Sequence, residues 1–559
     1  MPVNIGIIAD FNTDNLARLV EKHCAGIDAT VTAAPYAQVV QTLLNPELDF
    51  WERRYDALIL WTFPGTIATS FNDVRDFQSR SPEDLQSEVD AFADLVRGLS
   101  NRAHHVFLPS WVVSPDNSHS PSIEMKGDVG TAAALLRLNL RLVETLGTDP
   151  RVTLFNTERW IRQGGATAFS DKLWFLSKTP YSKTVFDEAA RDMVATLRGA
   201  RGLRKKVVIV DLDNTLWGGI VGDAGIEGLQ IGGHDAVGEA FSQFQNELKR
   251  LSRQGVVLAI VSKNEETIAF EAIDTHPDMV LRSQDFAGWR INWDDKARNI
   301  VDLMADLNLG LDSAVFIDDS THERNRVREA LPDVLVPEWP TDPMDYARAL
   351  RQLRCFENPE LSNEDRARTA MYVSDRQRKQ LQGELGSLET WLETLQLEVQ
   401  VEPLSPSNLE RTAQLLNKTN QMNLSTRRMS AHELSEWTSQ PNHRLWTFRV
   451  VDKLGDYGVC GIASVALDES RGQLVDFVLS CRAMGRGVEE AIISVAANKV
   501  REAGAREMAA AYVMTKKNKP CLRWFEQQSW FTLGDDGHTF LLDVGRETPA
   551  PKHIRITPA

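Results

Sequence analysis

The chain has 559 residues and a formal net charge of −16, with 42% hydrophobic and 25% charged residues. This length exceeds what one core usually supports, and the composition is that of a folded protein rather than a disordered one. The acidic balance argues against a nucleic-acid binder, which needs clustered Lys and Arg. No apolar run approaches the length of a membrane span. We therefore expect a cytoplasmic protein with neither a membrane nor a nucleic-acid partner.

Residues 1–200 are expected to form an α/β domain with a mostly parallel sheet, because short apolar runs alternate with amphipathic stretches. This part resembles a degenerate SGNH hydrolase. The segment at residues 169–182 contains Asp171, but Trp174 stands where that family has its histidine, and no serine lies at the nucleophile position near Asp10. We therefore expect a non-catalytic, SGNH-like docking or structural domain.

The central part, residues 201–356, also alternates strands and helices, and three of its predicted strands end in polar residues. These residues are Asp211 and Asp213 after residues 207–210, Ser262, Lys263 and Asn264 after residues 256–261, and Asp318 and Asp319 after residues 314–317. The carboxyl ends of parallel strands open the ligand crevice of an α/β sheet. An isolated D-x-D would more often solvate a loop or cap a helix, but here it has companions, including Lys296 at the start of a predicted helix.

Phosphoryl transfer through an aspartate requires this combination of groups. One carboxylate attacks phosphorus, a second moves a proton, a hydroxyl and a lysine hold the phosphoryl oxygens, and further acids bind a metal. Phosphate and carboxylates repel one another unless a divalent cation lies between them, so Mg²⁺ is implied as the cofactor.

Four ordered motifs carry a specific resemblance: DLDNTLWGG at residues 211–219, SKN at 262–264, INWDDKARNI at 291–300 and GLDSAVFIDDS at 310–320. The segment resembles the haloacid-dehalogenase superfamily and, within it, the FkbH-like group, which implies a central Rossmannoid domain. By this resemblance Asp211 is the nucleophile and Asp213 the general acid/base. The implied substrate or phosphate ligands are Thr215, Ser262, Lys263, Asn264 and Lys296, and the implied metal ligands are Asp211, Asp213, Asp318 and Asp319. The insertion at residues 218–233 is short and glycine-rich, which predicts an open site without a separate cap domain.

Residues 357–396 are polar and charged and are expected to form a helical linker before a last domain at residues 397–548. A loop with Arg482, Gly485 and Gly487 follows a predicted strand and precedes a helix, an arrangement that offers backbone amides to an anion. It resembles the acyl-CoA loop of GNAT acetyltransferases, and the domain resembles the GNAT-like α+β half of FkbH-like proteins. These three residues would then bind a phosphopantetheine arm; a tight helix-capping turn is the alternative.

Cys481 lies at the mouth of this loop, beside Arg482 and a helix N-terminus, which would favour a reactive thiolate. It is therefore a candidate catalytic residue, although a cysteine that packs as a small hydrophobe is the commoner case. Cys460, within an apolar run, is expected in the core.

FkbH-like proteins with both halves dephosphorylate 1,3-bisphosphoglycerate and load its glyceryl group onto the phosphopantetheine of an acyl carrier protein for polyketide biosynthesis. The resemblance implies the same Mg²⁺-dependent glyceryl transferase and phosphatase here. One departure is Val261, where many FkbH-like sequences have a cysteine. Three alternatives remain: a phosphohydrolase for another small phosphorylated metabolite, transfer of a different acyl group to a carrier protein, and a non-catalytic scaffold that docks carrier proteins.

Overall fold

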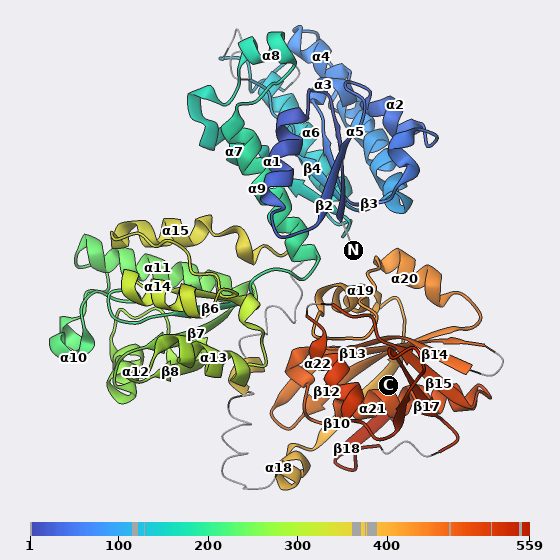
Figure 1. Ribbon diagram of the computed structural model, residues 1–559. Coiled ribbons are helices and arrows are strands. Elements are labelled where there is room, and N and C mark those ends of the chain that lie inside the picture. Colours follow the sequence, from blue (N-terminus) through green and yellow to red (C-terminus); the bar gives the residue numbers. More distant parts are fainter. Residues whose placement is uncertain are drawn as a thin grey trace. The chain divides into compact units, whose positions relative to one another are not determined.

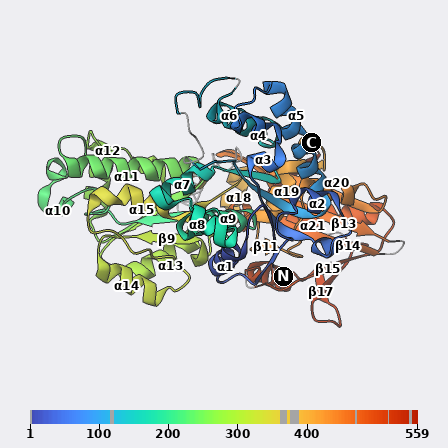
Figure 2. The same ribbon diagram turned by 90° about the horizontal axis from the view of Figure 1, so that it is seen from above.

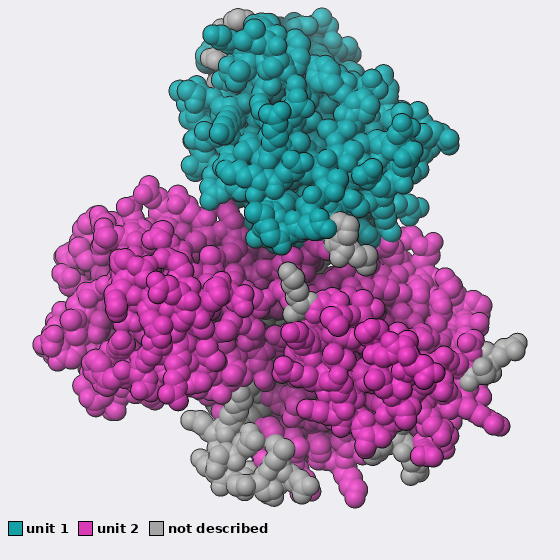
Figure 3. Space-filling model, viewed as in Figure 1, with its two compact units in different colours: residues 1–198 teal, residues 199–559 magenta. Residues whose placement is uncertain are grey.

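A computed structural model describes residues 3–114, 121–127, 129–359, 371–374, 376, 388–468, 471–515, 517–546 and 550–558. The chain divides into two compact units, residues 1–198 and 199–559 (Figure 3). Within the described residues the strands form three sheets, one in the first unit and two in the second (Figure 1). The prediction of a multidomain α/β protein is thus confirmed. No helix in the described ranges combines the length and the apolar character that crossing a bilayer demands.

The first unit contains a five-stranded parallel sheet in the order β2-β1-β3-β4-β5. Its strands are β1 (Val3–Ala9), β2 (Ala29–Ala33), β3 (Tyr55–Trp61), β4 (Ala103–Pro109) and β5 (Val152–Phe155). Helices α1 (Asp14–His23) and α9 (Lys183–Ala200) lie on one face, and α5 (Pro82–Arg97) and α6 (Thr131–Leu146) lie on the other (Figure 1). Their apolar side chains pack against the sheet in two separate clusters. Shorter helices are α2 (Val39–Leu44), α3 (Pro64–Ile67), α4 (Ser70–Arg75), α7 (Thr157–Gly164) and α8 (Asp171–Ser177).

Aromatic rings fill the carboxyl edge of this sheet between β1 and β3, where a doubly wound sheet would bind a ligand. Phe11 packs against Trp61, Phe63 and Tyr181, with ring centroids 5.5–5.8 Å apart. Asp10, the residue after β1, is buried and accepts a hydrogen bond from the backbone N–H of Phe63 at 2.7 Å. The packed rings agree with a structural role for the domain, which stays a prediction.

The second sheet has four parallel strands in the order β8-β7-β6-β9. They are β6 (Val207–Val210), β7 (Val257–Ser262), β8 (Phe286–Ile291) and β9 (Ala314–Ile317). β6 and β9 are wholly apolar and fully buried, as expected for parallel strands covered on both faces. Helices α11 (Ala236–Arg253), α12 (Glu266–Thr275) and α15 (Tyr346–Gln352) cover one face, and α13 (Lys296–Asp306) and α14 (Thr321–Ala330) the other (Figure 2). The short helix α10 (Val221–Ala224) follows β6.

The third sheet is mixed, with parallel pairing only at β14·β15 and β10·β18 in the described residues. Its strands are β10 (Leu397–Pro403), β11 (Met422–Asn423), β12 (His443–Asp452), β13 (Gly455–Leu467), β14 (Arg471–Leu479), β15 (Glu507–Ala511), β16 (Phe531–Leu533), β17 (Thr539–Asp543) and β18 (Ile554–Pro558). The helices are α18 (Leu388–Leu395), α19 (Leu409–Lys418), α20 (Ala431–Thr438), α21 (Val488–Glu502) and α22 (Lys519–Gln527). β18 lies beyond the predicted domain end at residue 548, and much of the predicted linker at residues 357–396 lies outside the described residues.

Candidate active site

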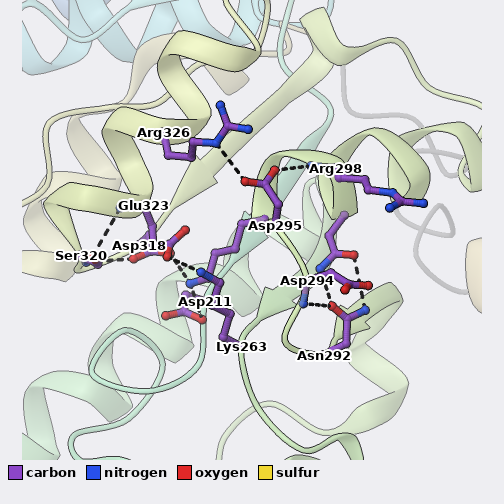
Figure 4. Close-up of polar contacts among 12 residues, drawn as sticks. Asp211, Lys263, Asn292, Asp294, Asp295, Arg298, Asp318, Ser320, Glu323 and Arg326 are labelled. Carbon is purple, nitrogen blue, oxygen red and sulfur yellow. Dashed lines mark hydrogen bonds and ion pairs between the residues drawn. The ribbon is translucent and has the colours of Figure 1, made fainter.

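Three carboxylates gather at the carboxyl edge of the four-stranded sheet. β6 pairs with β9 so that Val210 lies beside Ile317, and each strand is followed directly by an aspartate. Ligand oxygens of Asp211, Asp318 and Asp319 lie within 4.8 Å of one another. Figure 4 shows Asp211 and Asp318 side by side. Asp318 is completely buried and Asp211 nearly so, hence their charges are poorly solvated.

Lys296 places its ammonium group between two of these acids. It is the first residue of α13, whose start is fixed by Asp295, which accepts a hydrogen bond from the backbone N–H of Arg298 at 3.0 Å. Its Nζ lies 2.6 Å from Asp318 Oδ2 and 3.1 Å from Asp211 Oδ1. Burial alone would lower the pKa of Lys296, but the two carboxylates outweigh burial and raise it. The lysine is therefore a fixed cation at the centre of the site.

One ammonium does not balance three carboxylates. Burial and the nearby charge of Asp211 raise the pKa of Asp318 to about 7, and the same two causes raise the pKa of Asp319. Asp211 Oδ1, although paired in charge with Lys296, receives no hydrogen bond from any residue that the structure describes. Clustered carboxylate oxygens with an orphaned lone pair are a donor set that suits a hard divalent cation such as Mg²⁺.

Thr215 holds one of the acids instead of facing outward. Its hydroxyl accepts from the backbone N–H of Asp319 at 3.0 Å and lies 3.3 Å from Asp319 Oδ1, and the side chain is completely buried. The turn after β6 is tight, with the backbone N–H groups of Thr215 and Leu216 both directed to the carbonyl of Leu212. This turn points Thr215 at the Asp319 backbone, so the structure gives it a supporting role where the sequence predicted a phosphate ligand.

The carboxylate of Asp213 does not belong to the group of three among the described residues. Its Oδ1 accepts from the indole Nε1 of Trp217 at 2.9 Å and from the backbone N–H of Val221 at 3.1 Å, and its Oδ2 accepts from Asn264 Nδ2 at 2.9 Å. Burial raises its pKa despite these bonds. Both oxygens are thus engaged away from the metal-ligand group, in contrast to the predicted role of the side chain as a metal ligand.

The Ser-Lys-Asn motif divides among three environments. Ser262 ends β7, the strand next to β6, and is 2% exposed. Lys263 is exposed and its Nζ lies 2.7 Å from Glu323 Oε1, a contact drawn in Figure 4. Asn264 is buried and donates to Asp213, as described above. Only Ser262 and Lys296 therefore keep a placement that suits the predicted binding of a phosphate at Asp211.

Two further residues shape the site without having been predicted. Arg324 is buried and its Nη1 donates to the backbone carbonyls of Asp318 at 2.7 Å and Asp319 at 2.6 Å, which fixes the turn after β9. Trp217 contributes the indole donor to Asp213. Trp217 lies inside the DLDNTLWGG motif, so the sequence does mark its position. The sequence does not show which side chain accepts the hydrogen bond of its indole N–H group.

The loop after β14 already contains an internal carboxylate. Gly485 and Gly487 have φ values of 74° and 83°, which explains why glycine occupies both positions. The backbone N–H of Gly485 donates to Glu489 Oε1 at 2.8 Å, and burial raises the pKa of Glu489 to about 7. His553 Nε2 lies 2.8 Å from the carbonyl oxygen of Arg486. The loop therefore resembles the helix-capping alternative more than an open anion cradle; the side chain of Arg482 lies outside the described residues.

Cys481 is half-buried, and its Sγ lies 3.9 Å from the hydroxyl of Tyr372. It packs beside the apolar cluster that α13 forms with the four-stranded sheet. Cys460, by contrast, is completely buried in the core of the C-terminal part, as its apolar surroundings in the sequence predicted.

Known structures supply one informative comparison. No protein-family model matches the chain, and no curated protein shows significant similarity to it. The crystal structure of the N-terminal part of the protein BF1531 from Bacteroides fragilis, which contains a phosphatase domain and was determined in complex with Mg, matches with 29% identity and a TM-score of 0.58, over 64% of this chain and 95% of that one. Nourseothricin acetyltransferase matches over 26% of this chain and 98% of its own, with 16% identity and a TM-score of 0.19, which is too low to support a shared fold.

Proposed function

We propose that this chain is a Mg²⁺-dependent phosphatase that transfers a phosphoryl group through Asp211. The observation that carries the proposal is the group formed by Asp211, Asp318 and Asp319 around the ammonium of Lys296. The similarity to the phosphatase-containing part of BF1531 supports the same reaction class.

Asp211, Asp318 and Asp319 would hold the Mg²⁺, because their oxygens converge and Asp211 Oδ1 has no hydrogen-bond donor within the described ranges. The bound ion would supply positive charge that offsets the repulsion between the phosphate and the carboxylates. Arg324 and Thr215 fix the backbone and side chain of the two consecutive aspartates, so these ligands are held before any ion arrives.

The reaction follows from the placement of the side chains. A carboxylate oxygen of Asp211 forms a bond to phosphorus while the bond from phosphorus to the leaving oxygen breaks, and Asp213 gives its proton to that oxygen. Water then attacks the phospho-aspartate, its proton passes to Asp213, and the bond between phosphorus and Asp211 breaks to release inorganic phosphate. Lys296, and Ser262 on the adjacent strand, would hold the phosphoryl oxygens.

The more specific proposal is that the substrate is 1,3-bisphosphoglycerate and that the chain loads a glyceryl group onto the phosphopantetheine thiol of an acyl carrier protein. The thiol would attack the acyl phosphate carbonyl, the bond from that carbon to the phosphate oxygen would break, and the Asp211 centre would hydrolyse the remaining phosphoester. The FkbH-like motifs and the short insertion at residues 218–233 support this proposal. Val261 is completely buried in β7, so no thiol is available at the position where many FkbH-like proteins have a cysteine.

A second candidate is a phosphohydrolase that acts on a small phosphorylated metabolite without acyl transfer. The specific observation in its favour concerns Glu489. Its carboxylate already accepts a hydrogen bond from the backbone N–H of Gly485, which the sequence predicted would bind a phosphopantetheine phosphate. A non-catalytic scaffold is disfavoured, because Asp211, Asp318 and Lys296 form a buried, ion-paired group that docking alone does not require.

One experiment separates these functions. The protein is incubated with 1,3-bisphosphoglycerate, Mg²⁺ and a holo acyl carrier protein; phosphate is measured and the carrier is weighed by mass spectrometry. A glyceryl adduct on the carrier supports the transferase, and phosphate with an unmodified carrier supports the phosphohydrolase. Asp211→Asn, which removes the attacking charge with little change in shape, should abolish phosphate release in either case; retained release would exclude Asp211 as the nucleophile.

A further inference from the structure

Three donors, two from the segment after β6 and one from the segment after β7, hold the carboxylate of Asp213. The indole of Trp217 and the backbone N–H of Val221 reach Oδ1 at 2.9 and 3.1 Å, and the Asn264 amide reaches Oδ2 at 2.9 Å. Trp217 is completely buried within the apolar cluster that packs against one face of β6. Its ring cannot turn without opening that core, so its N–H group is a fixed point for the carboxylate.

None of these hydrogen bonds can reverse its direction. An indole N–H and a backbone N–H can only donate. The amide of Asn264 is also fixed as a donor toward Asp213, because its Oδ1 accepts from the backbone N–H of Glu265 at 2.9 Å. A proton carried by Asp213 therefore cannot be shared with these partners, and it must occupy a lone pair that points away from all three donors.

We propose that Trp217 is a positioning residue that, together with Asn264, directs the proton of Asp213 toward the leaving oxygen of the substrate. This inference rests on the proposed phosphoryl transfer to Asp211. In that step the leaving oxygen loses its bond to phosphorus and gains the proton from Asp213. Without the indole donor, Oδ1 keeps only the longer bond from the Val221 N–H at 3.1 Å. The carboxylate is then held less firmly, so protonation of the leaving oxygen becomes inefficient while attack by Asp211 is retained.

Leaving groups of different basicity test the inference. Trp217→Phe keeps an aromatic ring in the core and removes the N–H group. Its kcat/KM in the presence of Mg²⁺ is compared for phenyl phosphate and for p-nitrophenyl phosphate. Phenol has a pKa of about 10, so its phenolate needs a proton to leave, whereas p-nitrophenolate departs without one. Loss of general acid catalysis should lower kcat/KM about 100-fold for phenyl phosphate. For p-nitrophenyl phosphate it should change by no more than about threefold, since the attack itself is retained.

Matched variants distinguish positioning from a general loss of structure. Trp339 is another buried tryptophan of this sheet's core, and its Nε1 has no hydrogen-bond partner in the described part of the chain. Trp339→Phe should therefore affect both substrates equally. Asp213→Asn should reproduce the selectivity of Trp217→Phe, and combining the two substitutions should add no further loss. If Trp217→Phe does not fold, Asn264→Ala performs the same test on the other carboxylate oxygen.

The possible failures are distinguishable. If the wild-type protein releases phosphate and the Trp217 variant loses the same factor on both substrates, or none, the positioning role is wrong while the proposed phosphatase survives. If the wild-type protein releases no phosphate from either compound with Mg²⁺, the proposed function fails and the role of Trp217 fails with it.

Discussion

Lys296 is the only cation within ion-pairing distance of Asp211 and Asp318 in the described residues, which makes it the residue on which the site's stability most depends. Lys296→Met keeps the long apolar stem but leaves two buried carboxylates unpaired, a change that costs about 3–5 kcal/mol. We expect this loss in the free energy of unfolding when EDTA is present. Mg²⁺ should restore part of it, because a ligand that binds only the folded state stabilises that state.

Denaturant unfolding with and without Mg²⁺ measures the effect. Lys263→Met is the matched control, because Lys263 forms a more exposed ion pair with Glu323 and should cost less than about 1 kcal/mol. Equal losses of unfolding free energy in the two variants would show that Lys296 does not stabilise the buried carboxylates of Asp211 and Asp318.

For single residues, the sequence predicts which of them lie close together better than it predicts the hydrogen-bond partners of each side chain. Asp211, Asp318 and Lys296 meet because the carboxyl ends of neighbouring parallel strands and the start of a capped helix lie at one edge. Thr215 and Asp213 differ from expectation because a tight turn decides where their side chains point. Motif spacing contains no information about that direction.

The turn that connects β6 to the glycine-rich insertion depends on an asparagine in a left-handed conformation. Asn214 has φ of 56°, and its Oδ1 accepts from the backbone N–H of Gly219 at 3.0 Å. Asn214→Gly loses this hydrogen bond but tolerates the left-handed conformation. Asn214→Ala loses the hydrogen bond and also disfavours the left-handed conformation. We expect the alanine variant to be less stable than the glycine variant by about 1 kcal/mol.

Thermal or denaturant unfolding of the two variants checks this order. Gly98, whose backbone is helical and where an added Cβ would meet nothing within 4 Å, serves as the comparison: Gly98→Ala should be neutral or stabilising. If the alanine variant is as stable as the glycine variant, or more stable, the turn at position 214 can leave the left-handed conformation without a loss of stability.

Elements with continuous apolar runs were predictable, and those with mixed patterns were not. β6 and β9 match the predicted bounds because each is an uninterrupted buried run. β8, FAGWRI, was missed because Gly288 and Arg290 interrupt its apolar pattern, although it is a full member of the sheet through pairing with β7. Tertiary pairing overrides weak local propensity at such an edge strand.

The proposed active site lies in one of the two compact units. All residues assigned to phosphoryl transfer lie between positions 211 and 324, within the second unit. A chain that begins at residue 201, after α9, should therefore fold and release phosphate from p-nitrophenyl phosphate with kcat within about twofold of the full chain, because the groups that stabilise the transition state are unchanged. A steady-state assay with Mg²⁺ checks this, with circular dichroism to verify folding. A loss of more than tenfold would place a functional residue in the first unit.

The α/β class of the chain was visible in the sequence because predicted strands and helices alternate along it. The extent of the C-terminal sheet was not visible, because β18 is a five-residue strand whose partner residues in β10 lie 157 positions earlier in the chain, as in the pair Leu397 and Ile554. Pairing over such a separation leaves no local signal.

The carboxylate of Glu489 has a consequence for any phosphate-bearing arm that approaches the loop after β14. Because burial raises the pKa of Glu489 to about 7, this side chain is negatively charged above that pH and neutral below it. An anion would compete with the ionised carboxylate for the Gly485 amide, but it would meet a neutral acid once Glu489 had taken up a proton. Capture of an anion at this loop would thus be proton-coupled, stronger in mildly acidic solution and weaker in alkaline solution.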